Sequence, residues 1–173
     1  DFDPFKGPVI ERILPTTEAQ REVYVASVMG VDANCAYNES VSLILTGKLD
    51  RASLELALID LVRRHEALRA ICMELSNEEL KAIAHKDMTT PFDLVNGPLF
   101  RVSIMRMRAD EYVLRLSGHH ILIDGWSLGI MMAEISALYN AHKKGGVLKL
   151  PPAVPLSEYV LATIDFAKST EHA

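Results

Sequence analysis

Residues 99–120, LFRVSIMRMRADEYVLRLSGHH, carry the clearest secondary-structure pattern in the sequence. Apolar and polar residues alternate along residues 99–107, as they do in a strand with one buried face. Residues 108–111 turn the chain, and residues 112–120 return with the same alternation as a partner strand. The pattern predicts an antiparallel hairpin, the clearest in the sequence, whose second strand leads into two consecutive histidines.

Capping residues and apolar periodicity place the elements around this hairpin. Thr17 and Gln20 fit a capping box that opens a helix reaching about residue 29, and Asp50 can cap a second helix with its apolar stripe on one side. The remaining expected elements are a connection over residues 30–38, strands over 39–47 and 68–74, and helices over 76–86, 126–143 and 157–168. Because helices and strands interleave, we expect one α/β or α+β sandwich, a mixed sheet with helices packed on it.

Composition and charge exclude several classes of partner. The 173 residues are 49% hydrophobic and 24% charged, a normal balance for a soluble domain with a sizeable core. A net charge of −5 gives no electrostatic case for nucleic acid or an anionic membrane. Four arginines form the nearest approach to a basic cluster, and we expect them on a solvated strand face: Arg101, Arg106, Arg108 and Arg115.

Neither a membrane span nor a signal peptide is visible, so we expect a cytoplasmic protein with no membrane partner. The two cysteines, Cys35 and Cys72, are far apart and are expected to be buried, reduced thiols, although one disulfide stays open.

The hairpin ends in an H-H-x-x-x-D-G pattern made by His119, His120, Asp124 and Gly125. Strand alternation points the two histidines in opposite directions, so a catalytic role for both is not expected. His120 continues the apolar face, which predicts dry surroundings that favour the neutral imidazole needed by a general base. Gly125 lets the backbone approach a substrate, and the helix that follows begins with free N–H groups.

Taken from the residues alone, two other interpretations of this pattern stay open. The first is a structural histidine that is satisfied beside a turn aspartate. The second is a Zn or Fe site, because two His and one Asp can bind these metals. The opposed strand faces and the lack of an obvious further ligand weaken the metal interpretation.

Four segments resemble, in the same order, the motifs of condensation domains from nonribosomal peptide synthetases. They are residues 14–20 LPTTEAQ, 64–69 RHEALR, 91–99 PFDLVNGPL and 119–127 HHILIDGWS, with Tyr24 where the first motif commonly has Trp. Each motif alone is weak evidence, whereas four in order across nearly the whole chain make a chance match improbable.

The resemblance implies a chloramphenicol-acetyltransferase-like lobe, with residues 1–173 as the N-terminal lobe of a two-lobed domain. In this family, which also occurs in hybrid polyketide/peptide synthetases, the amine of one carrier-bound aminoacyl group attacks a second carrier's acyl or peptidyl thioester and forms an amide. The implied partners are the donor and acceptor carrier proteins, the second lobe and an adjacent adenylation domain. No cofactor is expected on the lobe itself, because the substrates ride on the carriers' phosphopantetheine arms.

The resemblance also assigns roles to the motif residues. His120 is the catalytic histidine, while His119 packs or hydrogen-bonds behind the strand. Asp124 shapes the motif loop through an ion pair, for which Arg69 is the candidate partner.

Gly125 is expected to contribute backbone near the reacting thioester, in a substrate-binding group completed by Trp126 and Ser127. Trp126 and Ser127 are further expected to anchor and cap the following helix more than they touch substrate. His65, His85 and His142 lie on predicted helices and are expected to be exposed or to serve in packing.

The chain departs from the family in two respects. The second lobe is absent from these residues, so His120 is expected on an open face and the isolated lobe is expected to be inactive. The stretch between Arg69 and Pro91 is also shorter than the family's usual insert.

Several related activities share parts of the pattern. An epimerization domain has the same H-H-x-x-x-D-G motif, and a coenzyme A-dependent acyltransferase belongs to the same superfamily. A non-catalytic lobe that docks carriers is the alternative from another class. Heterocyclization is disfavoured, because that subfamily has aspartates in place of the histidines.

Overall fold

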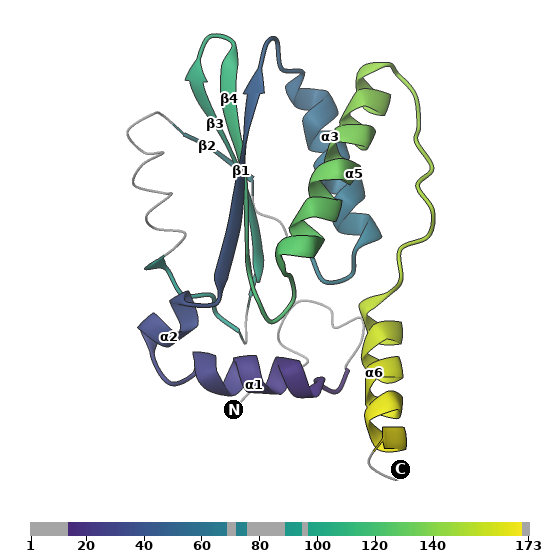
Figure 1. The fold of residues 1–173 in the computed structure, drawn as a ribbon. Coiled ribbons are helices and arrows are strands. Elements are labelled where there is room, and N and C mark those ends of the chain that lie inside the picture. Colours follow the sequence, from purple (N-terminus) through teal and green to yellow (C-terminus); the bar gives the residue numbers. More distant parts are fainter. Residues whose placement is uncertain (1–13, 69–71, 76–88, 95–96, 171–173) are drawn as a thin grey trace, which may run out of the picture.

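The computed structural model describes residues 14–68, 72–75, 89–94 and 97–170 of the chain (Figure 1). The helices are α1 (Glu18–Ser27), α2 (Val31–Cys35), α3 (Arg51–Arg64), α5 (Gly125–Lys143) and α6 (Leu156–Thr170). The strands are β1 (Asn38–Thr46), β2 (Cys72–Leu75), β3 (Phe100–Arg108) and β4 (Glu111–His119). Among the helices of these described residues, none has both the length and the hydropathy that a membrane span requires.

One four-stranded sheet carries the fold, in the order β1-β4-β3-β2. β3 and β4 pair antiparallel from Phe100 opposite Gly118 to Arg108 opposite Glu111, with an irregularity between Arg106 and Arg108, which confirms the predicted hairpin. β2 runs parallel to β3, so the sheet is mixed, as the interleaved elements predict.

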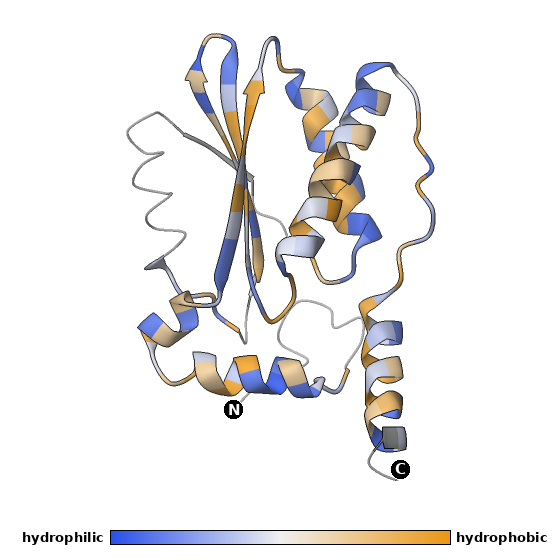
Figure 2. Cartoon of the chain, in the orientation of Figure 1, coloured by the Kyte–Doolittle hydropathy of each residue, from blue (hydrophilic) through white to orange (hydrophobic). Residues whose placement is uncertain are grey.

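β1 pairs antiparallel with the other edge of β4, along its whole length. Asn38 at the start of β1 lies opposite His119, and Glu39 lies opposite Gly118. Figure 2 shows that β1 is hydrophilic at this start and more hydrophobic toward its other end. The pairing therefore brings the polar beginning of β1 beside the two histidines.

Helices α3 and α5 lie side by side on one face of the sheet (Figure 1). Leu54, Leu58 and Leu61, three of the five residues of the predicted stripe, are buried in the core with side chains of β3, β4 and α5, whereas Val62 and His65 are only partly buried. Burying one such side chain contributes about 1.5–3 kcal/mol before entropy is counted. The strands and α5 contribute to the same cluster of buried side chains Phe100, Val102, Leu114, Leu116, Leu128, Met131 and Ile135.

The opposite face of the sheet is polar but is not solvated throughout. Arg115 is only 9% exposed, and its guanidinium donates to the hydroxyls of Ser40 at 2.8 Å and Ser42 at 3.4 Å. The prediction of a solvated arginine face is therefore wrong for Arg115, because neighbouring β1 supplies hydroxyl acceptors that the sequence does not place there. Arg106 and Arg108 are exposed, as predicted.

Most helix boundaries agree with the sequence signals. Thr17 and Gln20 form both bonds of the predicted capping box of α1, and Asp50 caps α3 by accepting from Ser53. The expected connection over residues 30–38 contains the short helix α2. The predicted helix over residues 76–86 lies outside the described residues, whereas the strand expected over residues 68–74 is described only as β2.

Helix α5 ends before Gly145, which has φ +69° and so occupies a left-handed conformation that suits glycine. The chain then runs extended to α6, which lies apart from α3 and α5 in Figure 1. Cys35 is a half-buried free thiol rather than a fully buried one, and burial raises its pKa, followed by an effect of Asp32.

Candidate functional site

The H-H-x-x-x-D-G motif forms the tight connection between β4 and α5. His119 is the last residue of β4, and α5 begins at Gly125. The carbonyl of His119 accepts from the backbone N–H groups of Leu122 at 3.0 Å and Ile123 at 3.3 Å, so the turn closes on the end of the strand. This short turn fixes the backbone on which both histidines and Asp124 are carried.

His119 is completely buried. Its Nδ1 accepts from the backbone N–H of Ile121 at 3.2 Å, which places the proton of the neutral ring on Nε2. Nε2 lies 3.4 Å from the hydroxyl of Ser27, and that hydroxyl in turn donates to the carbonyl of Val23 at 2.7 Å. Both ring nitrogens of His119 therefore face α1 and the turn, inside the lobe.

The surroundings of His119 favour its uncharged form. Burial lowers the pKa of His119, and the neighbouring His120 lowers it further, against an opposing hydrogen bond with the backbone of Asn34. The rings of Tyr37 and Phe92 lie 6.0 and 5.9 Å from the imidazole, centroid to centroid. His119 is thus held as a neutral, packed histidine.

His120 has the opposite surroundings. Its backbone N–H donates to the carbonyl of Tyr37 at 2.8 Å, but its side chain is 42% exposed. Nε2 of His120 lies 3.2 Å from a carboxylate oxygen of Glu39 on β1. The prediction of a dry site for His120 is wrong: β4 ends at His119, so strand alternation does not extend to His120, and the buried imidazole is that of His119.

Asp124 is the N-cap of α5. One of its carboxylate oxygens accepts from the backbone N–H of Ser127 at 2.7 Å and from the Ser127 hydroxyl at 2.6 Å. These two bonds, the side-chain bond first, lower the pKa of Asp124 and favour the carboxylate. Arg69, the predicted ion-pair partner, lies outside the described residues, so that pairing stays a prediction.

The predicted support of α5 by Trp126 and Ser127 needs correction. Trp126 is 81% exposed and so does not anchor the helix in this lobe. Asp124 is the residue that caps α5, and Ser127 only donates hydrogen bonds to its carboxylate. An indole in the first turn of a helix can be buried only where a neighbouring element covers it, and the sequence does not show whether one does.

Three motif segments that are distant in sequence meet at the turn. Gln20, from the first motif, donates from its side-chain amide to the carbonyl of Ile121 at 3.2 Å. The carbonyl of Leu99, from the third, accepts from the backbone N–H of His119 at 3.1 Å. These bonds give a physical reason why residues 14–20 and 91–99 accompany the histidine motif.

Phe92, also from the third motif, is fixed by a reciprocal pair of bonds with Asn34. The backbone N–H of Phe92 donates to the Asn34 side chain at 2.9 Å, and that side chain donates back to the Phe92 carbonyl at 3.3 Å. The guanidinium of Arg101 lies over the Phe92 ring, 3.9 Å from its centroid. The aromatic contact of His119 is thereby held in place.

The second motif pins α3 to α5. Arg64 donates from Nε to both carboxylate oxygens of Glu134, at 3.0 and 3.1 Å, and His65 Nε2 lies 2.7 Å from the same carboxylate. His142 makes a similar link, with Nε2 2.7 Å from Asp60. His65 and His142 thus serve in packing between helices, as expected, and His85 lies outside the described residues.

Sequence reasoning missed four residues of the site: Ser27, Asn34, Tyr37 and Glu39. Ser27 and Asn34 are buried polar residues, and Glu39 is the second residue of the edge strand β1. None lies in a recognisable motif, and only the pairing of β1 with β4 and the position of α1 bring them to the histidines.

No group of three or more His, Cys, Asp or Glu side chains in the described part of the chain is placed to hold a metal ion. The chemistry available at the turn is that of an accessible imidazole beside a carboxylate and a helix N-terminus. Such a group can accept or hold a proton on a substrate that approaches from solvent.

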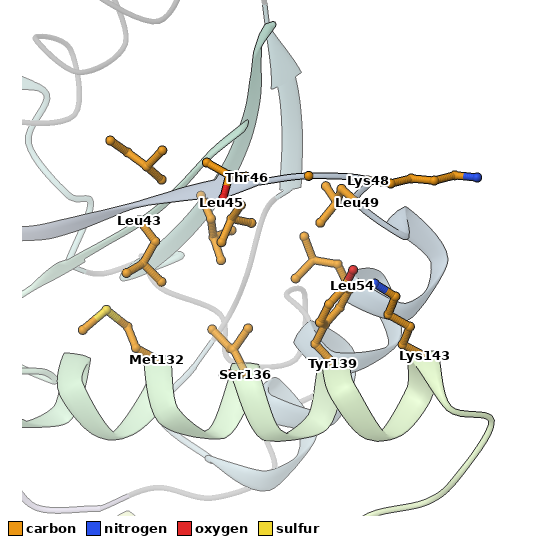
Figure 3. A pocket seen from close by; sticks show the side chains of 14 residues that line it. Leu43, Leu45, Thr46, Lys48, Leu49, Leu54, Met132, Ser136, Tyr139 and Lys143 are labelled. Atoms are coloured by element: carbon orange, nitrogen blue, oxygen red, sulfur yellow. The ribbon is translucent and has the colours of Figure 1, made fainter. Parts of the chain in front are cut away.

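A separate cavity of about 520 Å³ lies between β1, α3 and α5 (Figure 3). Leu43, Leu45, Leu54 and Met132 line it, with Lys48 and Lys143 at one side. It lies along the end of β1 away from Asn38 and His119, so it is not part of the candidate site.

Comparison with curated proteins finds similarity to parts of large synthetases. It is 31% identical over 165 residues to malpinin synthetase of Mortierella alpina, which covers 80% of this chain and 2% of the synthetase. It is 28% identical over 171 residues to surfactin synthase subunit 2 of Bacillus subtilis (strain 168), covering 87% and 5%. The chain thus spans only a small part of each relative.

Solved structures share the fold at low sequence identity. A variant of the starter condensation domain of rhizomide synthetase superposes with a TM-score of 0.83 at 17% identity, covering 91% of this chain and 45% of that one. The X-domain from teicoplanin biosynthesis, in complex with OxyB, gives 0.78 at 23% identity, covering 95% and 41%. The chain spans less than half of each of these proteins.

The family model for the condensation domain matches residues 10–80 and 73–173, two segments that meet within the short stretch between Arg69 and Pro91. The chain therefore belongs to the condensation domain family of nonribosomal peptide synthetases, of which it forms an N-terminal lobe portion.

Proposed function

We propose that this lobe forms one wall of a site that makes an amide bond between two carrier-bound substrates. The amine of an aminoacyl group attacks the carbonyl of an acyl or peptidyl thioester, the C–N bond forms, and the C–S bond breaks to leave a thiol. The observation that carries the proposal is the His120 imidazole, which is 42% exposed on a turn whose backbone is fixed by hydrogen bonds.

His120 is the proposed catalytic residue. It accepts a proton from the attacking amine or holds that amine by a hydrogen bond. General-base assistance of this kind is worth about 10²–10⁴-fold, and alignment of two tethered reactants can contribute more.

The supporting residues have distinct proposed roles. His119 and Asp124 hold the turn from inside and from the start of α5. Gly125, exposed as the first residue of α5, lets substrate approach the backbone N–H groups there. Trp126 and Ser127 follow on this first turn, and the exposed Trp126 is available to a substrate or to another part of the protein.

The proposed partners are a donor and an acceptor carrier protein, which deliver the substrates on phosphopantetheine arms, and a second lobe that forms the opposite wall. An adjacent adenylation domain would load the acceptor carrier. The coverage of 2–5% of large synthetases is consistent with such a multidomain setting.

The proposal is tested by replacing His120 with Ala in the full-length protein that contains this chain. Amide formation from loaded carriers should fall by about 10²–10⁴-fold, while the unfolding midpoint stays close to that of the parent because the side chain is half exposed. His142→Ala is the matched control, since His142 links α5 to α3 away from the turn.

Unchanged product formation by the His120 variant would contradict the proposal. Loss of activity in both variants, with a lowered unfolding midpoint, would assign the effect to folding. Exchange of the acceptor's α-hydrogen with deuterated water, without amide product, would instead identify an epimerization domain.

A further inference from the structure

Glu39 is the unexplained charged group at the candidate site. It is the second residue of β1, opposite Gly118, and one of its carboxylate oxygens lies 3.2 Å from Nε2 of His120. Its other oxygen lies 3.9 Å from the position that a Cβ atom on Gly125 would occupy. The carboxylate, 30% exposed, therefore occupies the space between the imidazole and the start of α5.

This contact conflicts with the proposed role of His120 as a general base. A distance of 3.2 Å between Nε2 and a carboxylate oxygen is a hydrogen bond only when a proton lies on Nε2. A general base must instead present an unprotonated nitrogen. With Nε2 in that form, two hydrogen-bond acceptors lie 3.2 Å apart, and a cationic donor bound beside them, within reach of each, would satisfy both.

We propose that Glu39 binds the ammonium group of the acceptor substrate, next to His120. This inference rests on the amide-forming function proposed above. An ammonium nitrogen carries three N–H donors, so one can bind the Glu39 carboxylate while another binds Nε2 of His120. A carboxylate acceptor makes such a bond stronger than a neutral one would.

The arrangement also gives the order of proton transfers. The ammonium gives one proton to Nε2 of His120 and becomes the nucleophilic amine. This amine attacks the thioester carbonyl, the C–N bond forms, and the C–S bond breaks. The second proton lost by nitrogen ends on the leaving sulfur, and the proton on His120 returns to solvent.

Glu39 therefore defines a class of acceptor. A substrate whose reacting group is an ammonium is attracted, whereas one with a hydroxyl in the same place gains nothing from the negative charge. Glycinamide and glycolamide form a matched pair of probes, because they differ only in carrying an amino group or a hydroxyl.

The test is NMR titration of the chain labelled with ¹⁵N-histidine, at about pH 7.5, where α-amino groups are largely protonated. Glycinamide should shift the His120 ring resonances saturably, and Glu39→Gln should weaken this binding by about fivefold to tenfold. Glycolamide should bind the parent and Glu39→Gln with equal affinity. Glu158→Gln, which removes one exposed charge from α6, is the control and should bind like the parent.

Equal glycinamide binding in the parent and in Glu39→Gln would overturn the inference. It would also be overturned if Glu39→Gln weakened glycolamide binding as much as glycinamide binding. The second result would mean that Glu39 only positions the imidazole. The titration is independent of catalysis. Glycinamide binding that depends on Glu39, without amide formation in the full-length protein, would refute the proposed reaction and leave the ammonium site standing.

Discussion

At the level of single residues, the two adjacent histidines have different roles: His119 is structural, and His120 is the proposed catalytic residue. His119 is fully buried, with both ring nitrogens directed at partners inside the lobe, whereas His120 is 42% exposed beside Glu39. The division arises because the strand ends between them: His119 completes β4, and His120 begins the turn.

The burial of His119 predicts a pH dependence of folding. Its pKa is lowered in the folded protein by burial and by His120, whereas in the unfolded chain it titrates near 6.5. The unfolded state therefore binds more protons as the pH falls below about 6.5, so the stabilisation is complete above that pH and is lost below it. The free energy of unfolding, from urea titrations, should decrease between about pH 7.5 and about pH 5.5.

His119→Asn is the variant that isolates this effect. Its side-chain oxygen can replace Nδ1 as acceptor for the Ile121 N–H, but it does not titrate in this range. The variant should be less stable at every pH, because its smaller side chain leaves a cavity, and its stability should depend less on pH. An unchanged slope would assign the pH dependence to other groups.

The turn between β4 and α5 shows, at the scale of elements, how a strand end and a helix start fix a site together. The strand supplies the backbone position of His119, and the helix is started by Asp124. Both elements belong to the core, so the position of the turn is set by packing rather than by its own few residues.

Substitution of Asp124 separates its role as a cap from its role as a charge. Asp124→Ala removes the acceptor for Ser127 and should lower the free energy of unfolding by about 1 kcal/mol. Asp124→Asn keeps an oxygen acceptor and should lower the free energy of unfolding by only a few tenths of a kcal/mol. If Asn costs as much as Ala in thermal unfolding, a charged partner such as Arg69 is the larger contribution.

Two glycines form a matched test of the packing between β4 and its neighbours. A Cβ on Gly118 would overlap the Ile123 side chain and lie 3.2 Å from the Leu99 carbonyl, so Gly118→Ala should destabilise by about 1–3 kcal/mol. Gly129, exposed in α5, has nothing within 4 Å of its Cβ position. Gly129→Ala should stabilise by up to about 1 kcal/mol. Equal effects in denaturant titrations would contradict the close approach at Gly118.

In the molecule as a whole, α3 and α5 cover one face of the sheet. The turn with His120 lies at one end of this layer (Figure 1). The exposed His120 and Trp126 are on this end. The chain spans 45% of the starter condensation domain that it superposes on. An accessible imidazole by itself does not align two tethered reactants.

We therefore expect the 173-residue chain to form no amide alone and to gain activity when a second lobe is supplied. The measurement is product formation from loaded donor and acceptor carriers, with and without a separately expressed remainder of the domain, after a pulldown for carrier binding. Carrier binding with no product in either case would favour a docking lobe. Product from the chain alone would show that this wall is sufficient.

The local elements and the family could both be inferred from the sequence alone. The hairpin, the capping box at Thr17, the cap at Asp50 and the stripe of α3 follow from periodicity and side-chain hydrogen bonding within a few residues, so they are readable without tertiary information. The four motifs in order likewise led to the family that the comparison confirms.

Which histidine is buried, and which side chain faces the other one, follows from tertiary contacts that the sequence does not show. Strand alternation cannot say at which residue the strand ends, and that residue separates His119 from His120. The pairing of β1 with β4, between segments about 80 residues apart, brings Glu39 to His120. Such contacts depend on register and packing between distant segments, which no local pattern in the sequence encodes.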